Sequence, residues 1–202
     1  MELVIASTNM HKVREFRSLL KSFGFEILSL RDFPEYTPPE ETGTTFQENA
    51  QLKAKSAAAF LKKWVLADDS GLVVPALQGA PGVYSSTYAG PEATDLENRI
   101  KLLASMKHFQ DTDRFAYFEC CICIADPAAE IKTFTGLCEG VIIEEAKGRH
   151  GFGYDAVFRK HEYNKTFAEL DTDVKNKISH RRKAFDKALI FLESLQEHAI
   201  LD

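Results

Sequence analysis

Long apolar runs and a basic charge excess are both missing from this 202-residue sequence. No stretch approaches the roughly 18 consecutive apolar residues of a membrane-spanning helix. The N-terminus, Met-Glu-Leu-Val-Ile-Ala, lacks the basic start and long apolar centre of a signal peptide. The net charge of -5 argues against a dedicated nucleic-acid binder, because such proteins usually have a basic surface. We therefore expect a cytoplasmic protein that binds neither membranes nor nucleic acids.

Cysteine is scarce, and its spacing does not suit a metal site. The four cysteines are Cys120, Cys121, Cys123 and Cys138, and three of them fall in one apolar run. A structural zinc site would need repeated C-x-x-C pairs or paired histidines, and the sequence has neither. We expect reduced thiols packed in the core.

Strands alternate with helices in the first half of the sequence and cluster in the middle. Apolar runs predict strands at residues 3–6, 26–30, 64–67, 115–125, 131–137 and 141–143. Helices are expected after the N-cap candidates Asn9, Thr45 and Thr94, and a last one over residues 184–195. This order predicts an α/β fold, a mixed twisted sheet with helices on both faces. We expect one domain, residues 1–202, of two lobes with an active-site cleft between them.

The segment between the first strand and the first helix has the chemistry of a phosphate site. It reads Ser7, Thr8, Asn9, Met10, His11 and Lys12. A helix N-terminus presents unpaired N–H groups and partial positive charge, and hydroxyls and an ammonium would add donors. A capped helix with a solvated lysine explains the segment equally simply. It is not a Walker A loop, because no G-x-x-x-x-G-K-[ST] occurs.

Two adjacent carboxylates, Asp68 and Asp69, follow an apolar run and precede Ser70 and Gly71. Carboxylates at the end of a buried strand are costly unless a cation or water meets them. Neighbouring strand residues face opposite ways, so the two aspartates should do different jobs. Mg²⁺ takes one or two carboxylates plus substrate phosphates, which suits this pair. A polar turn is the simpler alternative.

A second acidic segment contains Glu41 and Glu48, and Lys53 follows it on the helix that begins after Thr45. Glu48 already has a structural role as the third residue of a capping box. Glu41 is therefore the better candidate for a second metal carboxylate, although a solvated loop would explain it too.

Three glycines surround aromatic residues between Gly148 and Asp155. This composition lets the backbone approach a flat ligand, with Phe152 or Tyr154 available to stack on a base and Asp155 to accept protons from its edge. A tight turn with core aromatics is the alternative.

Basic residues gather between Lys175 and Arg182 in an otherwise acidic sequence. Lysine and arginine bind phosphates, and histidine or arginine can donate to a carbonyl oxygen of a base. The alternative is the solvated start of a helix.

Taken together and in this order, six motifs resemble the inosine triphosphate pyrophosphatase family. They are S/T-x-N-x-x-K, E-T-G-x-T-F-x-E-N-A-x-x-K-A, A-D-D-S-G-L, G-A-P-G-V-Y-S, G-F-G-Y-D and S-H-R, and they run from Val4 to about Leu195. Two positions depart from the pattern, since Thr87 stands where many relatives carry arginine and Ala156 where many carry proline.

The resemblance implies a homodimeric hydrolase that converts ITP, dITP or XTP to the monophosphate and pyrophosphate. It implies Asp69 as proton acceptor, and Asp69 with Glu41 as ligands of Mg²⁺. The implied substrate-binding residues are Ser7, Thr8, Asn9, Met10, His11, Lys12, Lys53, Ser70, Phe152, Gly153, Tyr154, Asp155, Lys175, His180 and Arg181. Two other functions stay open at this point: a pyrophosphatase for pyrimidine or modified nucleotides, and a nucleotide sensor without catalysis.

Overall fold

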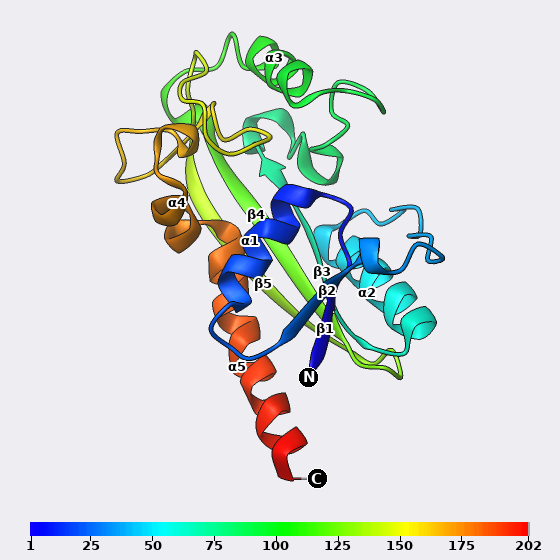
Figure 1. Cartoon of the computed structure of the whole chain (residues 1–202). Coiled ribbons are helices and arrows are strands. Elements are labelled where there is room, and N and C mark those ends of the chain that lie inside the picture. The colour runs from blue at the N-terminus through cyan, green and yellow to red at the C-terminus, as the bar shows by residue number, and fades with distance from the viewer. Residues whose placement is uncertain (202) are drawn as a thin grey trace. The chain divides into compact units, whose positions relative to one another are not determined.

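A computed structural model describes residues 1–201, with side chains for residues 1–196. Its strands are β1 (Glu2–Ile5), β2 (Glu26–Ser29), β3 (Trp64–Val73), β4 (Phe115–Ala125), β5 (Ile131–Ile142) and β6 (Phe158–Lys160). Its α-helices are α1 (Met10–Leu20), α2 (Phe46–Leu61), α3 (Asp95–Ser105), α4 (Thr172–Ile178) and α5 (His180–Leu201) (Figure 1). Among the described residues, no helix is long and apolar enough to cross a membrane.

One sheet contains all six strands, in the order β2-β1-β3-β4-β5-β6. Strand β1 runs parallel to both of its neighbours, whereas β6 runs antiparallel to β5. The predicted mixed α/β fold is therefore confirmed. The chain divides into two compact units, the first with residues 1–69, 120–136 and 181 onward, the second with residues 70–119 and 137–180. The predicted cleft between two lobes stays a prediction.

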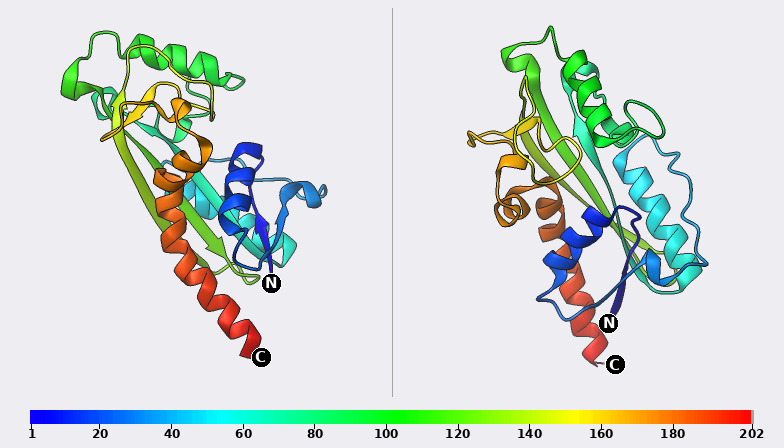
Figure 2. Two further views of the ribbon diagram at one scale, coloured as in Figure 1. Left: turned by 60° about the vertical axis from the view of Figure 1, so that its left-hand side comes forward. Right: turned by 45° about the horizontal axis from the view of Figure 1, so that its top comes forward.

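In the first unit, helices α1 and α5 pack on one face of the strands. Their apolar residues, Phe16 and Phe185 among them, form one core cluster with Leu3, Leu66 and Cys120. Figure 2 shows the ribbons of these two helices from two further directions. Helix α2 begins at the predicted capping box, in which the Thr45 hydroxyl accepts from the Glu48 N–H. Its buried residues are mostly alanines, which allow a close approach of its backbone.

The second unit has a core rich in aromatic rings. Phe118 lies edge-on to Phe158 at 4.7 Å and stacks parallel to Phe167 at 6.0 Å, measured between ring centroids. Leu102 of α3 and Val157 are buried in the same cluster. All four cysteines are buried free thiols, as predicted, and they are divided between the two units.

Several predicted element boundaries are wrong. Strand β3 does not end at Ala67 but continues to Val73. Asp68 and Asp69 can lie within the strand because Arg181 and Lys53 donate hydrogen bonds to their carboxylates. Residues 131–142 form one strand in place of the two expected. A Cβ at position 140 would lie 2.4 Å from the Arg159 carbonyl oxygen, so this glycine permits close pairing with β6. Strand β6 and helix α4 were not predicted, being short and only weakly periodic.

Candidate active site

Asp68 lies at the centre of a buried charge network in the first unit. Its side chain is fully inaccessible, and its Oδ2 lies 3.1 Å from Lys12 Nζ and 3.2 Å from an Arg181 guanidinium nitrogen. The same Arg181 guanidinium also donates to Glu15 of α1. Burial alone would raise the pKa of Asp68, but Lys12, Arg181 and Lys53 hold it well below its ordinary value. The network therefore joins β3 to α1 and α5 around a permanent carboxylate.

Asp69, the next residue, makes different contacts, as the alternation of a strand requires. Its Oδ1 lies 3.0 Å from Lys53 Nζ, and its Oδ2 accepts from the Asn49 side-chain amide at 3.3 Å. Both partners belong to α2, whereas the partners of Asp68 belong to α1 and α5. The prediction that the two aspartates have different roles is consistent with this division. Asp69 contacts α2, a helix with both buried and exposed residues.

The electrostatics of Asp69 favour a group that takes up a proton. Burial raises its pKa, Lys53 and Lys12 lower it, Glu41 raises it, and the net result is a pKa above the ordinary value. Burial lowers the pKa of Lys53, but Asp69, Asp68 and Glu41 outweigh that effect and raise it. Lys53 is therefore a charged lysine, and Asp69 is a stronger base than a solvated aspartate.

Glu41 and Glu48 are clearly separated by their contacts. Glu48 accepts from the Thr44 N–H at 2.7 Å and the Thr45 N–H at 3.2 Å, so it is engaged in the capping box. Glu41 is exposed on one side and lies 3.2 Å from Lys53 Nζ. Two carboxylates, Asp69 and Glu41, thus converge on one cation, the Lys53 ammonium.

The phosphate-binding candidate, residues 7–12, is the loop and first turn before α1. Asn9 caps the helix as expected, since its Oδ1 accepts from the His11 N–H at 2.9 Å and the Lys12 N–H at 3.4 Å. Ser7 Oγ accepts from the Asn9 N–H at 3.2 Å. Thr8 and His11 are exposed and Met10 is half-buried. Lys12 is held by Asp68, so it is a fixed cation at this helix start.

The second unit contains the candidates for contacts with the base, and Asp155 makes several of the contacts that hold their loop. Asp155 Oδ2 accepts from the Phe152 N–H at 2.9 Å and lies 2.6 Å from Lys175 Nζ of α4. Lys175 Nζ also lies 4.8 Å from the centre of the Phe152 ring. At position 151, φ is +76° and a Cβ would lie 2.0 Å from Asp155 Oδ2, so only glycine fits. The loop is therefore folded around its own buried carboxylate.

Tyr154 and His180 are buried in the same unit. The Tyr154 hydroxyl donates to the Ser85 carbonyl at 2.8 Å, and the His180 ring stacks on Phe118 at 4.7 Å. Ser70 follows Asp69 in β3 and belongs to this unit too. His180 and Arg181, adjacent in sequence, belong to different units, and Arg181 is buried against acidic residues of the first.

Comparison with known proteins decides the family. The sequence profile described as the Ham1 family matches residues 3–191. A dITP/XTP pyrophosphatase of Protochlamydia amoebophila is 56% identical over 199 residues, which are 98% of this chain and all of the relative. The chain belongs to the Ham1 family. The resemblance read from the six motifs is thereby confirmed.

Solved structures of Ham1 proteins share this fold over nearly their whole length. A HAM1 protein from Coxiella burnetii superposes with a TM-score of 0.88 at 40% identity, covering 96% of this chain and 99% of the other. The Staphylococcus aureus Ham1 protein gives a TM-score of 0.86 at 42% identity, with the same coverage. The fold of this Ham1 chain is therefore that of these two relatives.

Several polar residues of this Ham1 chain were missed by sequence reasoning. Asn49 contacts Asp69, and Glu15 contacts Arg181. Each could have been found only by its helical spacing from a known candidate. Asp95 and Arg99 of α3 bond to Gly153. They lie almost 60 residues away in sequence and carry no motif, so nothing in the sequence links them to the loop.

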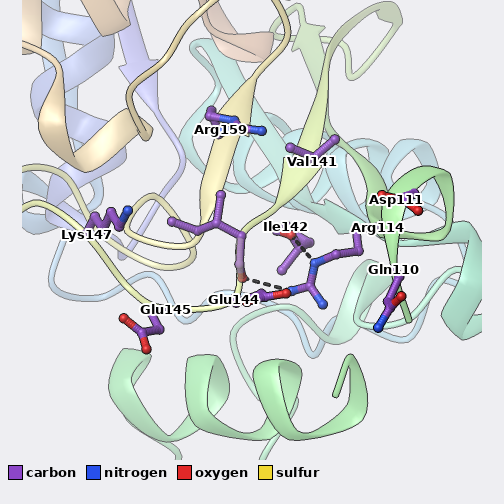
Figure 3. A pocket seen from close by; sticks show the side chains of 10 residues that line it. Gln110, Asp111, Arg114, Val141, Ile142, Glu144, Glu145, Lys147 and Arg159 are labelled. Atoms are coloured by element: carbon purple, nitrogen blue, oxygen red, sulfur yellow. Dashed lines mark hydrogen bonds between the residues drawn. The ribbon is translucent and has the colours of Figure 1, made fainter. Parts of the chain in front are cut away.

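The second unit of the Ham1 chain also contains a cavity of about 560 Å³ that holds none of the predicted site residues (Figure 3). Arg114 lies in its wall with its guanidinium bonded to the carbonyl oxygens of Ile142, Ile143, Met106 and Phe109. This arginine joins the turn before β4 to the end of β5 and to the segment that follows α3. None of the residues that line the cavity belongs to the candidate site.

Proposed function

We propose that this Ham1 chain hydrolyses ITP, dITP and XTP to the nucleoside monophosphate and pyrophosphate. The observation that carries the proposal is the group formed by Asp69, Lys53 and Glu41. It places a carboxylate with a raised pKa beside a charged lysine and a second acid. The family, and relatives named dITP/XTP pyrophosphatases, supply the substrate class.

The first unit has the groups for the triphosphate. The N-terminus of α1 provides backbone donors and partial positive charge, with Ser7 and Thr8 beside it. Lys12 and Lys53 are the two ammonium groups of this set, and each is oriented by an aspartate. Cations held in place by the fold stabilise charge that develops on the phosphates without reorganising.

Mg²⁺ fits the donor set that we assign to it. Within the described part of the chain, no group of three or more histidine, cysteine or acidic residues forms a closed metal site. Mg²⁺ does not need one, because it takes one or two carboxylates and completes its shell with water and substrate phosphates. Asp69 and Glu41 already converge on a cation, the Lys53 ammonium. When bound there, Mg²⁺ would neutralise phosphate charge and lower the pKa of a bound water.

Asp69 is the proposed general base. Its carboxylate takes a proton from the water that attacks the α-phosphorus, and the bond from this phosphorus to the bridging oxygen breaks. Pyrophosphate leaves, while Lys53 stabilises its developing negative charge. Asn49 fixes the orientation of the Asp69 carboxylate through its amide.

The second unit has the groups for the base. Phe152 and Tyr154 are its aromatic residues, Lys175 and Asp155 fix the loop, and His180 is the proposed donor to the purine 6-oxo group. Adenine has an amino donor at that position, so two donors would face each other. A mispaired buried polar group costs about 1–3 kcal/mol. A role of Arg181 toward the base would require it to leave its acidic partners, so we assign it to the support of Asp68.

A substrate panel tests the proposed function. Purified protein with Mg²⁺ should release pyrophosphate from ITP and XTP at least about fivefold faster, in kcat/KM, than from ATP, as one mispaired donor predicts. Chelation of the metal by EDTA should stop the reaction. Preference for UTP or dTTP would favour the pyrimidine alternative, and tight ITP binding without turnover would favour a sensor.

Lys53→Met should raise KM for ITP about tenfold or more, because a charge-assisted contact to phosphate is worth about 1.5–3 kcal/mol. Lys55→Met is the matched control, since Lys55 is exposed on the same helix. Steady-state kinetics and a thermal melt on both variants give the answer. Equal kinetics in the two variants would show that Lys53 binds no phosphate.

The homodimer and the cytoplasmic location expected from the sequence stay predictions. Light scattering on the purified protein measures the first directly.

A further inference from the structure

Side chains in the first two turns of α3 form hydrogen bonds with loops of the second unit. The Asp95 Oδ2 accepts from the Gly153 N–H at 2.7 Å, and one Arg99 guanidinium nitrogen donates to the Gly153 carbonyl at 2.6 Å. Asp95 and Arg99 are four residues apart, so they lie on one side of the helix. A single residue of the loop is thus held at both its N–H and its carbonyl by two charged side chains.

The same helix also holds the loop that contains Ser85. Asn98 is buried, its Oδ1 accepts from the Ala89 N–H at 2.7 Å, and its amide donates to the Ser86 carbonyl at 2.9 Å. Tyr154, next to Gly153, donates to the Ser85 carbonyl. Both loops therefore depend on α3 for their position.

Gly153 is the point at which this loop most needs an external restraint. Its φ is +57°, and a Cβ there would meet nothing within 4 Å, so packing does not fix it. Glycine has more conformational freedom to lose than any other residue. A loop that orders only when a ligand binds weakens the binding by the cost of that ordering. Bonds that hold Gly153 in advance would remove this cost.

We propose that Asp95 and Arg99 are positioning residues that preorganise the Phe152–Asp155 loop for the purine. The inference rests on the proposed function, which assigns this loop to the base. Charge-assisted hydrogen bonds are about twice as strong as neutral ones, and here one holds the peptide group on each side of the Gly153 Cα. The residues act on base binding through Gly153 and leave the chemistry at Asp69 unchanged.

The test compares Arg99→Met with Arg99→Lys, and both with a control in the same helix. Arg99→Met removes the donor to Gly153, whereas Arg99→Lys keeps an ammonium donor of similar reach. The control is Glu97→Ala, because Glu97 accepts from the Thr94 N–H and stabilises the start of α3 without contacting Gly153. Each variant is assayed for kcat and KM with ITP, for inhibition by inorganic tripolyphosphate, and for thermal stability.

Arg99→Met should raise KM for ITP about tenfold, the lower end of the effect of losing a charged hydrogen bond, with kcat within about twofold. The inhibition constant of tripolyphosphate, which has no base, should equal that of the wild type. Arg99→Lys should restore most of the ITP affinity. A wild-type KM in Arg99→Met, or an equal rise in Glu97→Ala, would overturn the proposal. Failure of the proposed function would look different, because the wild type itself would release no pyrophosphate from ITP.

Discussion

Asp69→Asn should lower turnover of ITP by about 10²–10⁴-fold, the usual contribution of a general base, with a further loss from weaker metal binding. Asparagine keeps the shape of the side chain and one acceptor oxygen, but it cannot take a proton from water. Asp69 accepts from Lys53 through Oδ1 and from Asn49 through Oδ2, so the single oxygen of asparagine keeps one of these contacts and the other is lost. The loss is one hydrogen bond, so we expect the fold and the groups for the triphosphate to remain.

Binding and turnover are measured separately on this variant. A non-hydrolysable methylene analogue of ITP, bridged between the α- and β-phosphorus, gives the affinity by calorimetry at fixed Mg²⁺. The affinity should change much less than turnover. Asp113→Asn, at an exposed carboxylate of the second unit, is the control and should behave as the wild type. If Asp69→Asn keeps a tenth of wild-type turnover, Asp69 is not the general base.

Asp68→Asn should act on stability first. The change leaves the buried Arg181 and the half-buried Lys12 without their carboxylate, and breaking a buried ion pair costs about 3–5 kcal/mol. For a chain of this length that cost corresponds to a fall in melting temperature on the order of 10 °C. Turnover at a temperature where the variant is folded should fall less than in Asp69→Asn. A lower turnover in Asp68→Asn than in Asp69→Asn would show that the roles of the two aspartates are assigned the wrong way round.

The pH dependence of this stability has a definite sign. The folded pKa of Asp68 lies below its ordinary value of 3.8, so the carboxylate stabilises the fold fully above that value and loses this effect as the pH falls toward the folded pKa. The difference in melting temperature between the wild type and Asp68→Asn should therefore be constant from about pH 6 to 8 and narrow in acid. Thermal melts of both proteins from pH 8 down into the acid range measure this difference. A difference that grew in acid would contradict the assigned charge.

A double-mutant cycle provides the control for this network. Arg181→Met should destabilise the protein on its own, and Asp68→Asn with Arg181→Met together should cost less than the sum of the two. Residues in direct contact usually show coupling of about 0.5–3 kcal/mol. Strict additivity would mean that the two residues do not stabilise each other.

The local signals in the sequence predicted the starts of three helices correctly. Asn9, Thr45 and Thr94 are N-caps as expected, because each side chain satisfies a backbone N–H within its own first turn. Such contacts depend on neighbours three residues away and so can be read locally. The opposite orientation of Asp68 and Asp69 follows in the same way from the alternation of a strand.

Contacts between distant residues could not be predicted in this way. The sequence predicts Arg181 to bind substrate, or else to lie at a solvated helix start, but the residue forms a buried ion pair with Asp68, which is 113 residues away in sequence. The end of β3 was placed too early for the same reason, since the cations that make a buried Asp68 tolerable come from other elements. Asp95 and Arg99 were missed because their partner is a backbone group, which has no signature in the sequence.

The position of water attack on ITP tests the proposed reaction most directly. Hydrolysis in ¹⁸O-labelled water, with the products separated and weighed by mass spectrometry, identifies the phosphorus that receives the oxygen. Attack at the α-phosphorus places the label in inosine monophosphate and leaves pyrophosphate unlabelled, and this is the result we expect. Label in pyrophosphate, or orthophosphate as the primary product, would contradict the proposed reaction.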